Sequence, residues 1–138
     1  MTVADLMVRD VVTVGPDELL FDAVMEMHKH HVRHLPVVDR QGYLLGILSN
    51  RDIRLLATAL PEEDIAQGKY SLSLETCIGA MMEEHPVVTR PDVELGEILD
   101  MFLEEKVGAI PVVDEDNRVV GIIGYVDLLR YFQKRCGL

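Results

Sequence analysis

The chain has 138 residues, of which 49% are hydrophobic and 27% are charged, and its formal net charge is −11 at pH 7. This length fits one globular domain, or two half-domains that share a core. The negative charge and the low aromatic content of 5% disfavour nonspecific binding to nucleic acid, which requires a cationic surface and stacking side chains. No membrane partner is expected either, because no apolar run reaches the roughly 18 residues that span a bilayer.

The first residues and the cysteines indicate a compartment. The chain begins without the basic region and long apolar stretch of a signal peptide, so we expect a cytoplasmic protein. Its two cysteines, Cys77 and Cys136, are too few for a disulfide framework and lack the spacing of metal ligands. We therefore expect both to be free thiols in a reducing environment.

The first half of the chain begins with three predicted elements. Thr2 and Asp5 have capping-box spacing, which predicts a short opening helix. The β-branched run 11–14 ends at Gly15 and predicts a strand followed by a turn. Apolar residues then recur at intervals of three and four, the pattern of an amphipathic helix: Leu19, Leu20, Ala23, Val24 and Met27.

Two strands and a helix complete this half. Pro36 begins a strand that reaches Val38, a position where the missing N–H of proline does least harm. Residues 39–42 turn the chain, and residues 44–48 run back as a buried strand, which makes a β-hairpin. Ser49 then caps a helix, whose predicted apolar face comprises Ile53, Leu55, Leu56 and Leu60.

The second half repeats the plan. Residues 87–89 form its first predicted strand, residues 110–113 and 119–123 its hairpin, and residues 125–135 its closing helix. A helical stripe precedes the hairpin: Leu95, Ile98, Leu99, Phe102 and Leu103. Residues 61–73, between the halves, are polar and without a strong period, so we expect a linker there.

The two halves are an ungapped duplication. Residues 35–53 return as residues 110–128, and the interval from Pro36 to Pro111 and from Asp52 to Asp127 is 75 positions in both cases. Such a repeat implies two copies of one supersecondary unit that pack together around a common core. Strands interleaved with helices, built twice, predict an α/β domain with pseudo-twofold symmetry.

This order of motifs resembles the CBS domain, named after cystathionine β-synthase, and specifically the tandem CBS pair or Bateman module. The residues that carry the resemblance are an apolar residue followed by Pro-Val-Val-Asp, at 35–39 and 110–114, and Asp52 and Asp127 early in the last helix of each half. The resemblance implies a β-α-β-β-α plan in each repeat. Repeat 1 would comprise residues 1–60, the linker 61–73, and repeat 2 residues 74–138.

The resemblance also implies a function. CBS pairs are regulatory sensors of adenosine-containing ligands such as AMP, ADP, ATP or S-adenosylmethionine, and they commonly dimerise through their helices. We therefore expect a stand-alone regulatory module, a homodimer that acts on an effector protein, without enzymatic activity and without a required cofactor.

Ser49 and Asp52 are the first candidate site residues. A hydroxyl and a carboxylate three positions apart at a strand-to-helix junction face the same mouth, where a carboxylate can accept both hydroxyls of a ribose. The helix N-terminus offers backbone donors and a positive dipole to a phosphate. The alternative is that the two residues only make a helix cap.

Arg33 and His34 precede the Pro-Val-Val strand, at positions that commonly contact phosphate in nucleotide-binding CBS proteins. The guanidinium of Arg33 suits a phosphate, and a protonated His34 adds a donor. In the CBS pair each cleft takes residues from both repeats. The main cleft would therefore comprise Arg33, His34, Ile47, Ser49, Asp52, Thr89, Arg90 and Val107. The second cleft would comprise Thr13, Gly15, Val32, Ile122 and Asp127.

The second copy lacks most of these polar groups. Gly108 and Ala109 stand where the first copy has its Arg-His pair, and Gly124 replaces the serine. Each lost charge-assisted contact costs about 1.5–3 kcal/mol. We therefore predict that the main cleft binds a phosphorylated adenosine ligand and that the second cleft binds weakly or not at all.

The histidine-rich segment 28–34 leaves an alternative open. His30 and His34 are four apart, and His31 and His34 are three apart, so these pairs would share a metal ion on a continuous helix. Pro36 requires the chain to leave the helix before it, and we therefore expect no metal site. A metal sensor, and a structural or interaction module without a physiological nucleotide, remain the alternatives to nucleotide binding.

Overall fold

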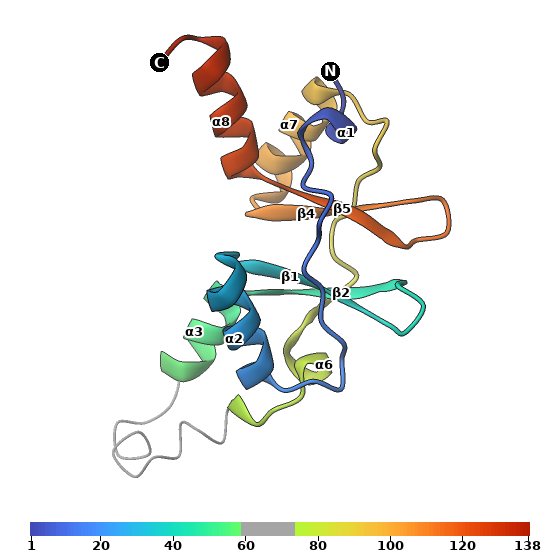
Figure 1. The fold of residues 1–138 in the computed structure, drawn as a ribbon, viewed down its shortest axis with the longest axis vertical. Helices are drawn as coiled ribbons and strands as arrows, with labels where there is room; N and C mark the ends of the chain where they lie inside the picture. Colours follow the sequence, from blue (N-terminus) through green and yellow to red (C-terminus); the bar gives the residue numbers. More distant parts are fainter. Residues whose placement is uncertain (59–73) are drawn as a thin grey trace. The chain divides into compact units, whose positions relative to one another are not determined.

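The computed structural model describes residues 1–58 and 74–138, so the predicted linker and Leu60 lie outside the described residues. Helices and strands alternate along the chain in the order expected for two similar halves (Figure 1). The described residues form two compact units. The first-repeat unit comprises Val12–Gln41 and Leu45–His85, and the second-repeat unit comprises Met1–Val11, Gly42–Leu44 and Pro86–Leu138.

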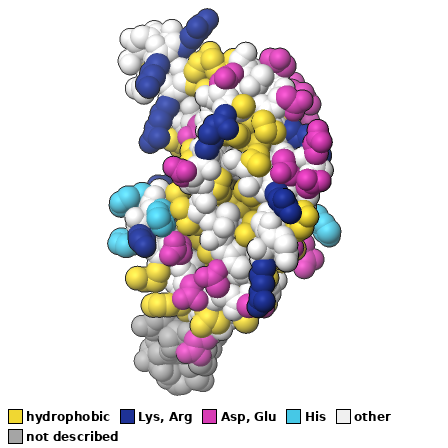
Figure 2. All heavy atoms as spheres, turned by 45° about the vertical axis from the view of Figure 1, so that its right-hand side comes forward, with side chains coloured by type: hydrophobic (Ala, Val, Ile, Leu, Met, Phe, Trp, Pro, Cys, Tyr) yellow, Lys and Arg dark blue, Asp and Glu magenta, His cyan; other side chains and the backbone are white. Residues whose placement is uncertain are grey.

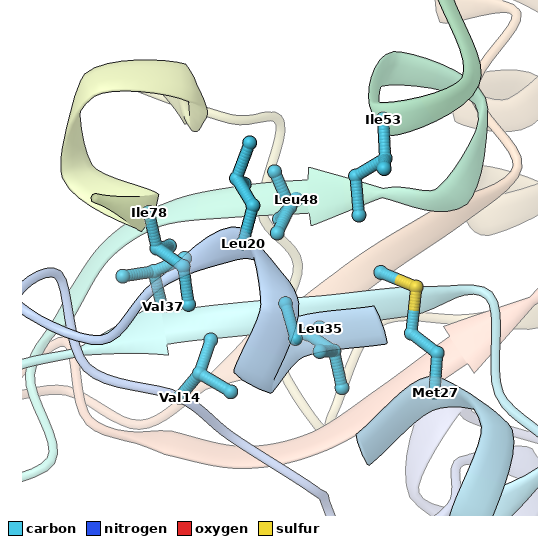
Figure 3. Close-up of a cluster of buried hydrophobic side chains, with 9 residues drawn as sticks. Val14, Leu20, Met27, Leu35, Val37, Leu48, Ile53 and Ile78 are labelled. Atoms are coloured by element: carbon cyan, nitrogen blue, oxygen red, sulfur yellow. The ribbon is translucent and has the colours of Figure 1, made fainter. Parts of the chain in front are cut away.

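The first-repeat unit is built on a three-stranded sheet in the order β1-β2-β3. These strands are β1 (His34–Val38), β2 (Leu44–Ser49) and the short β3 (Glu83–Glu84), which pairs antiparallel with β2. Three helices belong with the sheet: α2 (Leu20–His30), α3 (Asn50–Thr58) and α6 (Ile78–Met81). In the close-up, apolar side chains from α2, β1, β2 and α6 converge on one core (Figure 3).

The second-repeat unit has a two-stranded antiparallel sheet of β4 (Ala109–Val113) and β5 (Val119–Gly124). Its helices are α1 (Val3–Leu6), α7 (Leu95–Glu105) and α8 (Tyr125–Arg135). The buried core takes side chains from every one of these elements: Val3, Met7, Ile98, Phe102, Ile110, Val112, Ile123 and Leu128. The turn residues Gly42–Leu44 also belong here, and Arg118 lies 5.0 Å from the centre of the Tyr43 ring.

The opening helix of each copy packs with the other copy. The N–H of Val8, just after α1, donates to Ile122 of β5 at 2.8 Å, and the N–H of Leu20 at the start of α2 donates to Thr76 at 2.9 Å. Glycines allow a methionine to lie close against the strand in each case. A Cβ on Gly121 would meet the sulfur of Met7, and a Cβ on Gly46 would meet the sulfur of Met82. The two glycine contacts are equivalent, because Gly46 and Gly121 are 75 positions apart, as are Met7 and Met82.

Several of the expected helices and strands are confirmed. Thr2 and Asp5 do interact at the start of α1, because Asp5 Oδ2 accepts the N–H of Thr2 at 2.9 Å. The amphipathic pattern located α2 and α7, and the two hairpin regions form neighbouring strands. Cys77 and Cys136 are exposed free thiols. Among the described residues, no helix has the length and apolar character needed to cross a membrane.

Three expectations were wrong in detail. The predicted strands 11–14 and 87–89 reduce to single parallel bridges, at Val14 with Val37 and at Thr89 with Val112. Each segment meets the strand beside it at one residue only, which is too short for a ladder. Leu103 was placed on the apolar stripe of α7 but is 74% exposed, and Leu55 of α3 is 55% exposed. The helix α7 therefore buries a narrower face than its sequence indicates.

Candidate functional site

Arg33 and Asn50 meet at the junction between β2 and α3. The N–H of Asn50, the first residue of α3, donates to the carbonyl of Arg33 at 2.8 Å. Ser49 ends β2, and its hydroxyl oxygen accepts the N–H of Asp52 at 3.0 Å. The predicted cap is therefore present, and the bond from Asn50 to Arg33 holds the start of β1 beside the first turn of α3.

The carboxylate of Asp52 is half-buried at this junction. Its backbone N–H is used by the cap, but among the hydrogen bonds of the described residues none ends on the carboxylate itself. The negative charge of Asp52 acts on His34, the first residue of β1. The acid is thus partly desolvated and keeps its acceptor oxygens available.

His34 is half-buried between charges of opposite sign. Burial lowers the pKa of His34 below its ordinary value of 6.5, the Asp52 charge opposes this shift, and the Arg33 charge adds to it. A histidine shifted in this direction is neutral at pH 7. Arg33 itself is exposed, whereas Ile47 in β2 is buried with 7% exposure.

The corresponding junction of the second-repeat unit has the same backbone and different side chains. The N–H of Tyr125 donates to Gly108 at 3.3 Å, as Asn50 does to Arg33. Here Asp127 is the cap, since its Oδ2 accepts the N–H of Gly124 at 2.8 Å. The carboxylate that corresponds to Asp52 is therefore occupied, and the adjacent residues Gly108 and Ala109 carry no charge.

Thr89 is the one buried polar residue in the part of the chain that the structure describes, with 4% exposure. Its N–H donates to Pro111 at 3.0 Å and its carbonyl accepts from Val113 at 3.0 Å. Its Oγ1 has no hydrogen-bond partner among the described residues. An unpartnered buried hydroxyl costs about 1–3 kcal/mol, so it requires an explanation.

The protein-family comparison decides the assignment of this fold. The CBS domain profile matches residues 3–58 and 78–134. The chain belongs to the CBS domain family. Its strands, helices and duplicated junctions are those of two CBS repeats, as the sequence resemblance implied.

Several CBS proteins of known sequence resemble the chain. It is 32% identical over 127 residues to the CBS domain-containing protein YhcV of Bacillus subtilis, covering 92% of this chain and 82% of that protein. It is 30% identical over 126 residues to inosine-5′-monophosphate dehydrogenase of Methanocaldococcus jannaschii, but there it spans 22% of the enzyme's length. The match to protein MJ1225 of the same organism covers 46% of that protein's length.

Solved CBS structures match almost end to end. The CBS domain pair of protein MJ0100, in complex with 5′-methylthioadenosine and S-adenosyl-L-methionine, has a TM-score of 0.80 and 25% identity, with 98% of both chains covered. CBSX2 in complex with AMP also has a TM-score of 0.80, with 27% identity over 97% of both chains. Those proteins bind adenosine compounds.

The structure brings together, within one unit, five of the residues predicted for the main cleft: Arg33, His34, Ile47, Ser49 and Asp52. The other three lie in the second-repeat unit, where Arg90 is exposed and Val107 half-buried. Each predicted cleft takes residues from both units, so its assembly stays a prediction.

The residues predicted for the second cleft are also divided between the units. Thr13 is exposed, Gly15 donates its N–H to Glu18 at 2.5 Å, and Val32 donates to Met27 at 3.0 Å. Ile122 exchanges hydrogen bonds with Val8.

The equivalent of Thr89 in repeat 1 is Val14, not Thr13. The predicted second cleft contained Thr13, but the residue that bonds as Thr89 does is Val14, through Pro36 at 3.1 Å and Val38 at 2.9 Å. The constant interval of 75 was the signal that could have shown this. It places Thr13 opposite the exposed Val88.

The histidine-rich segment does not continue as a helix. α2 ends at His30, and His31 has a left-handed backbone with φ of 55°. His30 pairs with Glu26 at 3.2 Å. The space-filling view shows histidine side chains gathered at the surface (Figure 2). Within residues 1–58 and 74–138, no group of three or more His, Cys, Asp or Glu side chains is placed to hold a metal ion.

Proposed function

We propose that the chain is a regulatory module that binds an adenosine-containing ligand, AMP, ADP, ATP or S-adenosylmethionine, mainly at the β2–α3 junction of repeat 1. The observation that carries this proposal is the half-buried Asp52 carboxylate, which accepts no hydrogen bond within the described residues and whose charge acts on His34, next to the guanidinium of Arg33. The solved complexes of MJ0100 and CBSX2 with adenosine compounds support it.

Each side chain has a distinct role in this proposal. Asp52 accepts the two ribose hydroxyls, a charge-assisted arrangement worth about 1.5–3 kcal/mol per bond. Arg33 binds the phosphate with its planar guanidinium. The N-terminus of α3, which has nine residues, adds a positive dipole at the same place.

Thr89 supplies the contribution of repeat 2 to this cleft. A ligand hydroxyl or phosphate oxygen would satisfy its orphaned Oγ1, which explains why a buried position carries threonine where repeat 1 carries valine. Arg90 and Val107 belong to the same proposed set, with Ile47 as the apolar contact for the base. The second cleft has no Arg-His pair, and Asp127 is engaged as a helix cap. We therefore expect it to bind weakly or stay empty.

Ligand binding would act by a shift of population. A nucleotide that contacts both repeats favours one arrangement of them, which a second protomer or an effector protein reads in the cytoplasm. Couplings of this kind amount to about 1–3 kcal/mol. A ligand that binds both arrangements equally well does not shift the equilibrium between them. The proposed preference arises because the ligand contacts both repeats at once in only one arrangement.

Calorimetric titration with AMP, ATP and S-adenosylmethionine tests the proposal. The matched variants Asp52→Ala and Asp127→Ala remove the same atoms from equivalent positions. We expect one main binding event, abolished by the first substitution and retained after the second. Absence of binding by all three ligands would contradict the proposal, and equal loss in both variants would contradict the preference for repeat 1.

A further inference from the structure

His34 lies at the start of β1, next to the junction at which we propose that phosphate binds. It is half-buried, and the bond from Asn50 to the Arg33 carbonyl fixes it beside the first turn of α3. In the described part of the chain, the charged groups that act on it are Asp52 from α3 and Arg33 from the segment before β1. Burial has the largest effect on the pKa of His34 and outweighs the opposing Asp52 charge, so the neutral imidazole is favoured in the ligand-free protein.

A phosphate bound at this junction would change that balance. It adds at least one negative charge close to a half-buried histidine on which the charge of Asp52 already acts. Arg33, the opposing cation, would be neutralised by the same phosphate, which removes its unfavourable effect on a protonated imidazole. Both changes favour the charged form of His34.

We propose that a phosphorylated ligand binds to repeat 1 together with a proton, which His34 takes from solvent. The inference rests on the proposed function and specifies how that site is regulated: acidification strengthens the binding of a nucleotide phosphate. The junction of repeat 2 has Ala109 in this position and lacks any such group. Proton uptake therefore belongs to one of the two repeats.

The test is titration of the whole chain with AMP in buffers of different ionisation enthalpy, which measures the protons taken up per ligand bound. Adenosine, which has no phosphate, serves as the second probe. The variant His34→Gln removes the titrating group and keeps a neutral donor. The variant His31→Asn removes an exposed histidine three positions earlier, at a left-handed residue that asparagine tolerates.

Between pH 8 and pH 7 we expect uptake of a substantial fraction of one proton with AMP, and about none with adenosine. The AMP affinity then rises toward the limit of about tenfold per pH unit that one linked proton allows. His34→Gln abolishes the uptake and His31→Asn leaves it unchanged. AMP binding with no uptake, or equal uptake in His34→Gln, would refute the inference while the proposed function stands. Failure of AMP to bind would overturn both.

Discussion

Thr89 stands in repeat 2 where Val14 stands in repeat 1: each exchanges backbone hydrogen bonds with equivalent positions of the neighbouring strand, yet only Thr89 buries a hydroxyl. The two side chains have nearly the same shape. The same backbone position therefore holds an apolar side chain in repeat 1 and an unpaired hydroxyl in repeat 2. This pair provides a natural isosteric comparison within one chain.

Thr89→Val should make the ligand-free protein more stable and the ligand weaker. Removal of the unpaired hydroxyl recovers about 1 kcal/mol of the free energy of unfolding, while loss of a ligand hydrogen bond lowers AMP affinity about fivefold to tenfold. Urea unfolding and calorimetry measure the two effects. The reverse change, Val14→Thr, is the control and should destabilise by about 1–3 kcal/mol. A destabilised Thr89→Val protein would show that the hydroxyl has a partner.

Arg33→Ala should discriminate between phosphate and nucleoside. We expect AMP affinity to fall at least tenfold, because a charge-assisted bond contributes about 1.5–3 kcal/mol, and adenosine affinity to stay the same. Lys29→Ala removes the same charge from an exposed position on α2 and should change AMP affinity less than about twofold. Similar losses in both variants would mean that only the general positive potential of the segment matters.

His34 should lower the stability of the ligand-free protein in acid. Its pKa in the folded chain lies below 6.5 because of burial, so below that pH the unfolded chain binds the proton more readily than the folded chain. The contribution is fully present above pH 6.5 and is lost as the pH falls through the folded pKa. The unfolding free energy of the wild type should therefore fall relative to His34→Gln between pH 7.5 and pH 5. A constant difference would contradict the shift.

Two glycine substitutions should change the free energy of unfolding in opposite directions. A Cβ on Gly46 would lie 2.7 Å from the carbonyl oxygen of Glu83 and 2.8 Å from the Met82 sulfur, so Gly46→Ala forces β2 and β3 apart. We expect a loss of about 1–3 kcal/mol in thermal or urea unfolding. Gly96 on α7 has no neighbour within 4 Å, and Gly96→Ala should gain about 0.5–1 kcal/mol. Equal effects would mean that the approach of β3 to β2 is not tight.

The sequence predicted local structure well where one physical cause dominates. Apolar spacing located α2 and α7, and the Thr2–Asp5 cap located α1. The sequence overestimated the length of the strand at Val14, because β-branched residues also suit an extended segment with a single bridge. Exposure of Leu103 could not be predicted either, since periodicity gives the direction of a face and not its width.

The site was predictable as a set of residue types but not as a set of contacts. The duplication identified Asp52 and Asp127 as equivalents, and only the structure shows that Asp127 caps α8 through Gly124 while the Asp52 backbone is the capped group. One hydroxyl, on Ser49, reverses the direction of this bond. The interval of 75 also says which residues correspond, but not that α1 packs on the strands of the other copy.

That exchange of opening helices bears on how such a chain descends from a single repeat. A solitary copy would carry a helix whose docking strand lies in another molecule, and its own glycine-containing strand would be left uncovered. Two solitary copies satisfy both needs by trading helices, which is domain swapping. Fusion of their genes turns a contact that dilution can break into one held at a fixed effective concentration. In the duplicated polypeptide the exchange of helices is therefore independent of protein concentration.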